Sequence, residues 1–365
     1  MRFPEFKEVW KDSNIGKCFD LYSGNTPSRM EKEHFIGDVN WITSGELKEH
    51  YIGSTKERIS EKAAADNNLR ILPVGTFVMA IYGLEAEGVR GTCSITVKTS
   101  TISQACMAFT PKSNVSNEFL YSWYKKHGNK IGIRYAQGTK QQNLSYDIIE
   151  KFPIRYPSIE EQEKLNTFIS LLDSRIATQN KIIEQLQSLI KGIVVSITTE
   201  TPNTRIDKCL VCHSSTLQEN HIEDFGDFPV YGANGICGYT VNADFNEPAI
   251  LIVKDGSGVG NVRFVNGKYS VIGTQNILTP QNRFCLKYIF YCLQAFNFMP
   301  YKTGMAIPHI YFKDYGKSKI YCPNFEQQVK IASQIDLIES KIEIETQLLN
   351  KYEEQKKFLL SNMFI

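Results

Sequence analysis

The 365-residue sequence contains no long hydrophobic run, although 42% of its residues are hydrophobic. A membrane-spanning helix needs about 18 or more consecutive apolar residues, and no segment approaches that length. The first ten residues are charged, unlike the apolar segment of a secretory signal. We therefore expect neither a transmembrane helix nor a signal peptide, no membrane partner, and a cytoplasmic location.

Motifs of several enzyme classes are also missing. There is no Gly-x4-Gly-Lys-Ser/Thr phosphate-binding loop, and no Asn/Asp-Pro-Pro-aromatic sequence of the kind that holds an amine for methylation. Asp38 with Glu46 and Lys48 could form a magnesium nuclease site, but such a pattern occurs by chance in most charged chains. We find no catalytic set of residues, and we expect no cofactor.

Nine cysteines are present, and without a secretory context they are expected to be reduced and mostly buried. Cys209-Leu210-Val211-Cys212-His213 fits the pattern of covalent haem attachment, which requires export. Zinc would need a second pair of ligands at a suitable spacing, but Cys237 is alone, and Cys285 and Cys292 are seven residues apart. We therefore expect no metal site.

The strongest positive feature is an internal repeat. The segment 157–165 matches 323–331 at a shift of 166 positions, with Pro, Glu, Gln and Lys in identical places. Each copy begins with a possible capping box, Ser158 with Glu161 and Asn324 with Gln327, which predicts the start of a helix.

A long helix is predicted after each start, because apolar residues recur at alternating steps of four and three. The first series runs Leu165, Ile169, Leu172, Ile176, Gln179, Ile183, Leu186, Ile190 and Ile193, and the second runs Ile331, Ile335, Ile338, Ile342, Glu345, Leu349, Tyr352, Lys356 and Leu359. About 40 residues give each helix a length of about 60 Å. A single such helix is typical of a core stripe or a homodimer zipper. Two matched copies favour antiparallel pairing within one chain, with Gln179 facing Glu345.

The repeat extends into the segments between the helices, which predicts four regions. These are a first domain at 1–156, a first long helix at 157–197, a second domain at 198–318, and a second long helix at 319–365. Each domain combines a buried strand, a glycine-rich turn and a helix, namely 76–82, 83–91 and 117–127 in the first and 248–253, 256–260 and 285–296 in the second. The fold class is α+β, and the second glycine turn is expected to be a hairpin rather than a cofactor loop.

A polar loop, 137–143, ends the first domain, and the loop repeats in the second, where 304–310 falls 166 positions after 138–144. Amide side chains such as those of the first loop can bond a base edge through a donor and an acceptor at once, although a solvated loop is the alternative. The two helices hold 9 of the 41 basic and 12 of the 39 acidic residues, which leaves 32 bases against 27 acids elsewhere. That balance permits a polyanionic partner without requiring one.

The whole sequence resembles the specificity subunits of type I restriction-modification systems. The resemblance rests on two domains, each followed by a long helix that begins at Pro-x-x-Glu-x-Gln (157–162 and 323–328). It also rests on Trp10 with Ile15-Gly16, Gly24-x-Thr26-Pro27-Ser28, the segment 37–45 and Gly138-Thr139-x-Gln141-x-Asn143-Leu144. The second domain lacks the Gly-x-Thr-Pro-Ser and Asp-x-x-Trp elements, so residue roles transfer to it less directly.

This resemblance implies a non-catalytic subunit that reads a split, asymmetric target in double-stranded DNA, one half with each domain. Two modification subunits and two restriction subunits are the implied protein partners, with docking expected at Glu163, Arg175, Glu339 and Lys341. A self-contained methyltransferase or nuclease and a coiled-coil scaffold are the alternatives. The candidate DNA-binding residues are Ser44, Lys48, Tyr82, Arg90, Gln104, Thr139, Lys140, Gln141, Asn143, Tyr231, Asn234, Lys254, Arg263, Gln275, Lys302 and His309.

Overall fold

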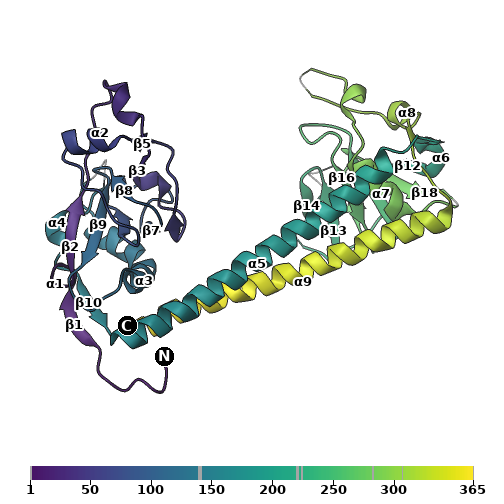
Figure 1. Ribbon diagram of the computed structural model, residues 1–365. Helices are drawn as coiled ribbons and strands as arrows, with labels where there is room; N and C mark the ends of the chain where they lie inside the picture. Colours follow the sequence, from purple (N-terminus) through teal and green to yellow (C-terminus); the bar gives the residue numbers. More distant parts are fainter. Residues whose placement is uncertain are drawn as a thin grey trace. The chain divides into compact units, whose positions relative to one another are not determined.

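The computed structural model describes residues 2–138, 142–218, 222, 225–281, 283–305 and 307–364. It divides into two compact units (Figure 1). Unit 1 contains the residues up to 178 and those from 349 onward, and unit 2 contains 179–348. The helices α5 (Ile159–Thr198) and α9 (Phe325–Met363) each contribute one part to each unit.

Unit 1 is built on a five-stranded sheet and a three-stranded sheet. The larger sheet has the order β2 (Phe19–Ser23), β9 (Cys106–Pro111), β6 (Phe77–Ala80), β7 (Cys93–Thr96) and β4 (Tyr51–Ile52). The smaller has the order β5 (Arg58–Ile59), β3 (Val39–Ile42) and β8 (Ser100–Ile102). All residues of β6 and β7 are buried, because the helix α3 (Asn117–Tyr135) packs on these strands. This explains why β6 reads as a continuous apolar run.

The helix α3 is longer than the sequence predicts, because it continues through Gly128 to Tyr135. Gly128 and Gly132 lie where the glycine-rich turn approaches the helix. A Cβ at Gly132 would lie 2.5 Å from Arg90 Cγ, and a Cβ at Gly91 would lie 2.9 Å from the backbone nitrogen of Asn129. The helical glycines therefore serve close packing, and the prediction that Gly128 ends the helix is wrong.

Unit 2 has a four-stranded and a three-stranded sheet. The orders are β12 (Leu210–Ser214), β18 (Gln275–Pro280), β15 (Ala249–Val253) and β16 (Val262–Val265) in one, and β14 (Gly235–Thr240), β13 (Phe228–Gly232) and β17 (Ser270–Val271) in the other. The helix α7 (Leu286–Gln294) packs on β15 and β16, close to its predicted range. The antiparallel pairing of β15 with β16 confirms a hairpin around the second glycine turn.

The two units repeat one topology. Antiparallel pairs β2–β9, β9–β6 and β6–β7 in unit 1 correspond to β12–β18, β18–β15 and β15–β16 in unit 2, and the parallel pair β3–β8 corresponds to β13–β17. A short ribbon closes each unit beside a long helix: β1 (Lys11–Asn14) with β10 (Pro153–Tyr156), and β11 (Thr204–Arg205) with β19 (Lys319–Ile320). The repeat seen in the sequence is therefore a repeat of the fold.

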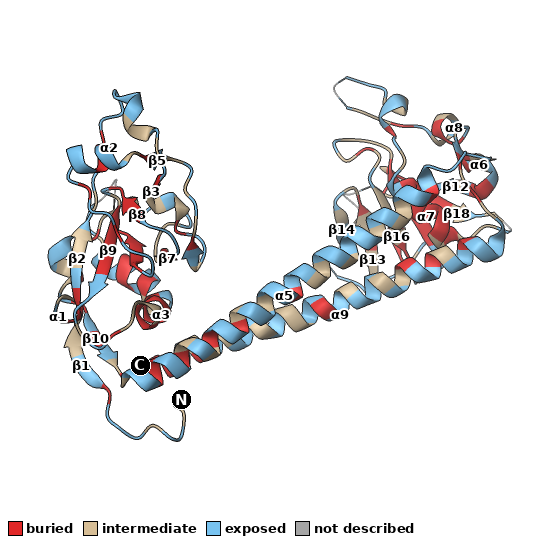
Figure 2. Cartoon of the chain, viewed as in Figure 1, coloured by how far each residue is buried: buried red, intermediate tan, exposed pale blue. Residues whose placement is uncertain are grey.

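Within each unit, α5 and α9 pack antiparallel. In unit 1 the core includes Leu165 and Leu172 of α5 together with Leu359 of α9. In unit 2, Ile197 of α5 shares a core with Ile335 of α9, while Gln179 Nε2 donates to the backbone oxygen of Glu345 at 3.2 Å and to its carboxylate. The expected contact between the two polar seam residues is confirmed. Buried residues recur along both helices (Figure 2).

The helix starts follow the predicted capping only in part. The N-cap oxygens accept as expected, from Glu161 N to Ser158 Oγ at 3.4 Å and from Gln327 N to Asn324 Oδ1 at 2.9 Å. The carboxylate of Glu161 does not complete a capping box. It accepts two bonds from Arg2, at 2.7 and 2.6 Å, because the N-terminal segment packs across the start of α5.

Candidate functional site

The loop at 137–143 is held by its backbone against the end of β6. Gln137 N donates to Asn143 O at 2.8 Å, and Asn143 N donates to Gln137 O at 2.9 Å. Leu144 N donates to Ile81 O at 2.9 Å, which places the base of the loop beside Tyr82 and the glycine-rich turn. A loop base that is held by backbone hydrogen bonds is a rigid support for a binding segment.

We call the paired bases of the loop and the strand end that holds them the loop frame. Unit 2 contains the same frame, with loop residues 166 positions later in the sequence. Thr303 N donates to His309 O at 2.9 Å, and His309 N donates to Thr303 O at 2.8 Å. Ile310 N donates to Lys254 O at 2.9 Å, so this loop is joined to the end of β15. Gly138 and Gly304 both have positive φ, 108° and 86°, which allows the chain to turn sharply into each tip.

Three of the predicted base-contacting residues, Thr139, Lys140 and Gln141, lie outside the described residues. Beside them, Gln142 is held on both sides: its side-chain oxygen accepts from Arg90 Nη2 at 2.7 Å, and its backbone nitrogen donates to Glu85 Oε2 at 2.7 Å. The second bond lowers the pKa of the Glu85 carboxyl. Arg90 therefore supports the loop, while the ring of Tyr82, 39% exposed, is open to solvent beside it.

The remaining predicted residues of unit 1 come from segments other than the loop. Ser44 begins a short 3-10 helix, η2 (Ser44–Glu46), which a capping box between Thr43 and Glu46 fixes, and Lys48 is exposed just after it. Gln104 is exposed in the turn between β8 and β9. Its neighbour Ala105 accepts a backbone bond from Ile81 at 2.9 Å, so Gln104 lies close to the loop frame.

In unit 2, Arg263 and Tyr231 form a pair on adjoining elements. The guanidinium carbon of Arg263 lies 5.8 Å from the centre of the Tyr231 ring, and Asn234 is exposed in the turn that follows β13. Lys254, Lys302 and His309 are partly exposed and belong to the frame or flank it.

Gln275 requires a correction. It lies on the central strand β18 and is only 1% exposed, because the strand is covered on both faces. A side chain buried to that degree has no access to a groove of DNA, so Gln275 belongs to the core of unit 2.

Sequence reasoning missed the residues that attach each domain to its long helix. Gln162 is fully buried: its Oε1 accepts from Ser116 N at 2.9 Å, and its Nε2 donates to Asn114 O at 2.7 Å and to Pro157 O at 3.1 Å. Gln328, 166 positions later, accepts from Cys285 N at 3.0 Å and donates to Pro323 O at 2.8 Å. The repeated Gln was the available signal, since it appears in both copies of the motif.

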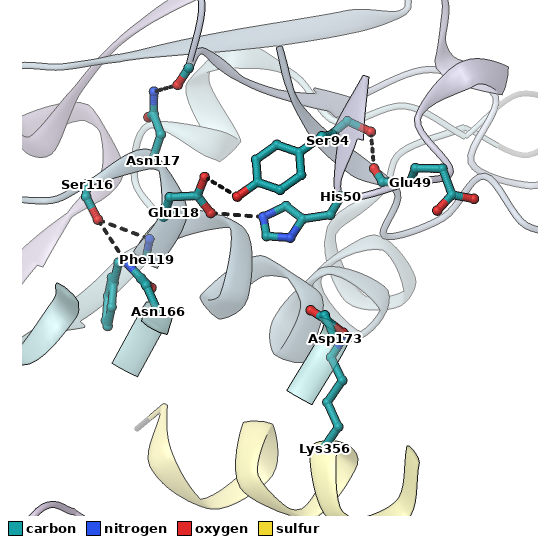
Figure 3. Close-up of polar contacts among 12 residues, drawn as sticks. Glu49, His50, Ser94, Ser116, Asn117, Glu118, Phe119, Asn166, Asp173 and Lys356 are labelled. Carbon is teal, nitrogen blue, oxygen red and sulfur yellow. Dashed lines mark hydrogen bonds and ion pairs between the residues drawn. The ribbon is translucent and has the colours of Figure 1, made fainter. Parts of the chain in front are cut away.

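Further polar contacts fix α3 in unit 1 (Figure 3). Ser116 Oγ accepts from Phe119 N at 3.1 Å and from Asn166 Nδ2 of α5 at 3.4 Å. Glu118 contacts His50 Nε2 at 2.9 Å and accepts from Tyr51 Oη at 3.0 Å. The first domain is thereby joined to α5 by buried and half-buried hydrogen bonds rather than by apolar packing alone.

The predicted docking residues are exposed, but two of them have partners within unit 2. Glu339 accepts from Tyr291 Oη at 2.9 Å, and Lys341 forms an ion pair with Glu345. Glu163 and Arg175 are exposed on the unit 1 part of α5. The sequence reasoning overlooked large apolar side chains that are exposed on the same helices: Leu171 and Phe358 in unit 1, and Leu337 and Ile344 in unit 2.

Other features of the described residues bear on chemistry. No group of three or more His, Cys, Asp or Glu side chains among them is placed to hold a metal ion. No helix in the described ranges combines the length and the hydropathy needed to cross a membrane.

A cavity of about 290 Å³ in unit 1 is lined by Trp123, His127, Ile131 and Phe152 among others, and burial lowers the pKa of His127 to about 4.

Comparison with known proteins gives one consistent family. The family described as "Type I restriction modification DNA specificity domain" matches residues 7–188 and 211–354. The specificity subunit of type I restriction enzyme MjaIX from Methanocaldococcus jannaschii is 32% identical over 197 residues, 50% of this chain and 44% of that protein. The alignment therefore spans less than half of this relative's length. The EcoprrI specificity subunit from Escherichia coli is 22% identical over 363 residues, 88% of this chain and 86% of that protein.

Solved structures agree with the fold. The crystal structure of a type I restriction-modification S subunit from M. genitalium has a TM-score of 0.64 at 17% identity and covers 100% of this chain and 99% of its own. A structure from work on complex assembly and conformational transition of the type I system has a TM-score of 0.60 at 13% identity, with coverage of 98% and 97%.

Proposed function

Because the chain belongs to the type I restriction modification DNA specificity domain family, we propose that it reads a bipartite sequence in double-stranded DNA, one half with each domain. The observation that carries this proposal is the duplicated loop frame, in which Gln137 pairs with Asn143 and Thr303 pairs with His309 through equivalent backbone hydrogen bonds. Two frames with different tips suit two different half-sites.

Side chains on the surfaces of both units have the chemistry that DNA contact requires. Lys48 and Gln104 in unit 1, and Lys254, Lys302 and Arg263 in unit 2, are at least partly exposed. Lysine and arginine position a protein on phosphates, while amide, arginine and aromatic groups discriminate between bases. We include Thr139, Lys140, Gln141 and Asn143 among the readers of the first half-site.

A binding selection tests this proposal. Full-length protein, with its modification subunits where they are needed for solubility, is incubated with random duplex DNA at two salt concentrations, and the retained sequences are read. We expect two short conserved blocks separated by a spacer without sequence preference. Retention of all sequences alike would leave only non-specific phosphate binding, and no retention at low salt would favour a scaffold without a DNA function.

We further propose that α5 and α9 set the length of that spacer. Removing one heptad from each helix, 176–182 and 342–348, preserves the spacing of the seam but removes about 10.5 Å of rise, close to 3 base pairs of DNA. The shortened protein should select a shorter spacer or lose the full site while it retains each half-site. Unchanged preference across a series of spacer lengths would overturn this role of the helices.

The protein partners we propose are two modification subunits and two restriction subunits, with the modification subunits docking on the long helices. Support comes from Leu171 and Leu337, which are exposed at positions 166 residues apart. Exposed apolar side chains on a helix are suited to packing against helices of another protein. Leu171→Lys and Leu337→Lys should each weaken binding of one modification subunit, which the mass of the complex measures, whereas Glu184→Lys, an exposed control on α5, should not. A saturated complex with one modification subunit per chain would contradict this stoichiometry.

A further inference from the structure

The tips of the two loops differ in chemistry although their frames agree. The first tip reads Gly-Thr-Lys-Gln-Gln (138–142), and the second reads Gly-Met-Ala-Ile-Pro (304–308). In the second, Met305 is fully exposed and Ile307 is 67% exposed. Single exposed apolar residues are ordinary, but two on the tip of a supported loop place an apolar surface where the other domain carries amides and a lysine.

The residues of the second tip that the structure describes are also restrained. The residue before a proline is confined to extended conformations, and Ile307 precedes Pro308. Pro308 O accepts from Gly256 N at 3.0 Å, so the tip is tied to the glycine turn that follows β15. A Cβ at Gly304 would lie 2.4 Å from Ile307 O, so this turn requires glycine. The two apolar side chains are therefore presented by a restrained backbone, which limits the entropy lost on binding.

Charge around the tip restricts what the apolar surface can meet. Lys302 and Lys254 flank the loop on its two supports, and Lys313 lies 5.1 Å from the ring of the neighbouring Tyr311. Asp255 lies beside Lys254 and Asp314 follows Lys313, so three lysines stand against two acids around the loop. An apolar loop tip that is flanked by lysines complements a polyanion that exposes apolar groups between its phosphates. In the major groove of DNA, the group of this kind is the 5-methyl of thymine.

We propose that Met305 and Ile307 contact thymine methyl groups, so that the half-site of the second domain contains A·T pairs at the contacted positions. This inference rests on the proposed function and specifies how one domain performs it. The first domain reads its half-site through hydrogen bonds, and the second reads part of its half-site through apolar contact.

Uracil substitution provides the test, because uracil keeps every hydrogen-bonding group of thymine and lacks only the methyl. The full-length chain, or its complex with modification subunits, is titrated with the selected duplex and with duplexes that carry uracil in one half-site. Arg263→Ala identifies the half-site of the second domain by the half at which affinity falls. Each lost methyl contact should weaken binding about fourfold, from about 0.8 kcal/mol per buried methyl.

The double variant Met305→Ala with Ile307→Ala should bind more weakly and should no longer distinguish uracil from thymine. Met299→Ala, another exposed methionine of unit 2, should distinguish them as the parent does. Thermal denaturation checks that all three proteins are folded.

The outcomes separate this inference from the proposed function. A selected half-site without thymine, equal affinity for uracil and thymine DNA, or uracil sensitivity that persists in the double variant would each overturn thymine reading and leave sequence-specific DNA binding intact. Absence of any selected sequence would overturn both.

Discussion

The loop of unit 1 and the loop of unit 2 share backbone hydrogen bonds to within 0.1 Å, yet at equivalent positions one has Gln141 and the other Ile307. The bonds that form the frame use only backbone atoms, so they do not depend on which side chains the tip carries. Backbone pairing and a few buried residues therefore specify the scaffold, and the side chains of the tips are free to differ.

A second difference lies at the starts of the long helices. In unit 1 the residue before the buried glutamine is Glu161, itself buried and paired with Arg2, whereas in unit 2 it is Gln327, which is exposed. The N-terminal segment covers the start of α5, and in unit 2 the equivalent residue of α9 stays in solvent. The same position of the repeat therefore contributes to stability in one copy and is expected to tolerate substitution in the other.

The largest expected effect concerns the buried glutamines. Gln162→Leu leaves the half-buried backbone groups of Ser116 and Asn114 and the buried carbonyl of Pro157 without their partner, at about 1–3 kcal/mol for each group. We expect a loss of about 4 kcal/mol in the free energy of unfolding of unit 1. Gln328→Leu, with two such bonds, should cost unit 2 less. Urea denaturation followed by near-ultraviolet circular dichroism measures both, and equal small losses would mean that the bonds are replaced by water.

Next in size is the ion pair at the start of α5. Arg2→Ala leaves the buried Glu161 carboxylate with Trp10 Nε1 at 3.4 Å as its remaining side-chain donor. Breaking a buried pair costs about 3–5 kcal/mol, and because the Arg2 side chain is 26% exposed we expect about 2 kcal/mol. Gln327→Ala should change stability by less than about 0.5 kcal/mol. Adding Glu161→Gln to Arg2→Ala should restore part of the loss, and an additive further loss would argue against the pair.

Replacing either of the equivalent tip residues with alanine should alter the DNA preference, and the change in binding free energy should be smaller than the stability losses above. Gln141→Ala should weaken binding to the first half-site about tenfold, from about 1–3 kcal/mol for a bidentate contact, and leave the second half-site unchanged. Ile307→Ala should affect only the second half-site. Half-site competition in a mobility-shift assay checks both. A uniform loss on every DNA sequence would assign these residues to phosphate contact or folding.

The smallest expected effect is a dependence on pH that comes from a histidine of unit 1. Burial lowers the pKa of His127 on α3 to about 4, below its ordinary value of 6.5, whereas α7 contains no histidine. The unfolded chain therefore binds the proton more readily, so this contribution to stability is complete above pH 6.5 and is lost as pH falls toward 4. His127 is partly exposed, so we expect about 1 kcal/mol.

His127→Gln provides the control for that measurement. The free energies of unfolding of parent and variant are compared at pH 7 and pH 5, so that other titrating groups cancel in the difference. The advantage of the parent should shrink at pH 5. A constant difference between the two proteins would show that His127 does not titrate on unfolding in this range.

Local and repeated patterns determined the features that the sequence could predict. The apolar seams predicted both long helices, and the shift of 166 predicted the duplicated domains. The polar seam residues Gln179 and Glu345 predicted the register at which α5 meets α9. These predictions depend on spacing along one element or on equality between two segments, and both are visible without coordinates.

Which side chains are buried and which are paired depends on the tertiary structure. Gln275 carries a polar group suited to base contact, but its strand is central and covered. Gly128 has the residue type that ends helices, but here the helix continues, and a Cβ at this position would lie 2.7 Å from the Tyr124 ring. Arg90 could reach a phosphate, but Gln142 accepts its hydrogen bond. The physical reason is common to all three: burial and pairing depend on segments distant in the sequence, and no local pattern records which segments those are.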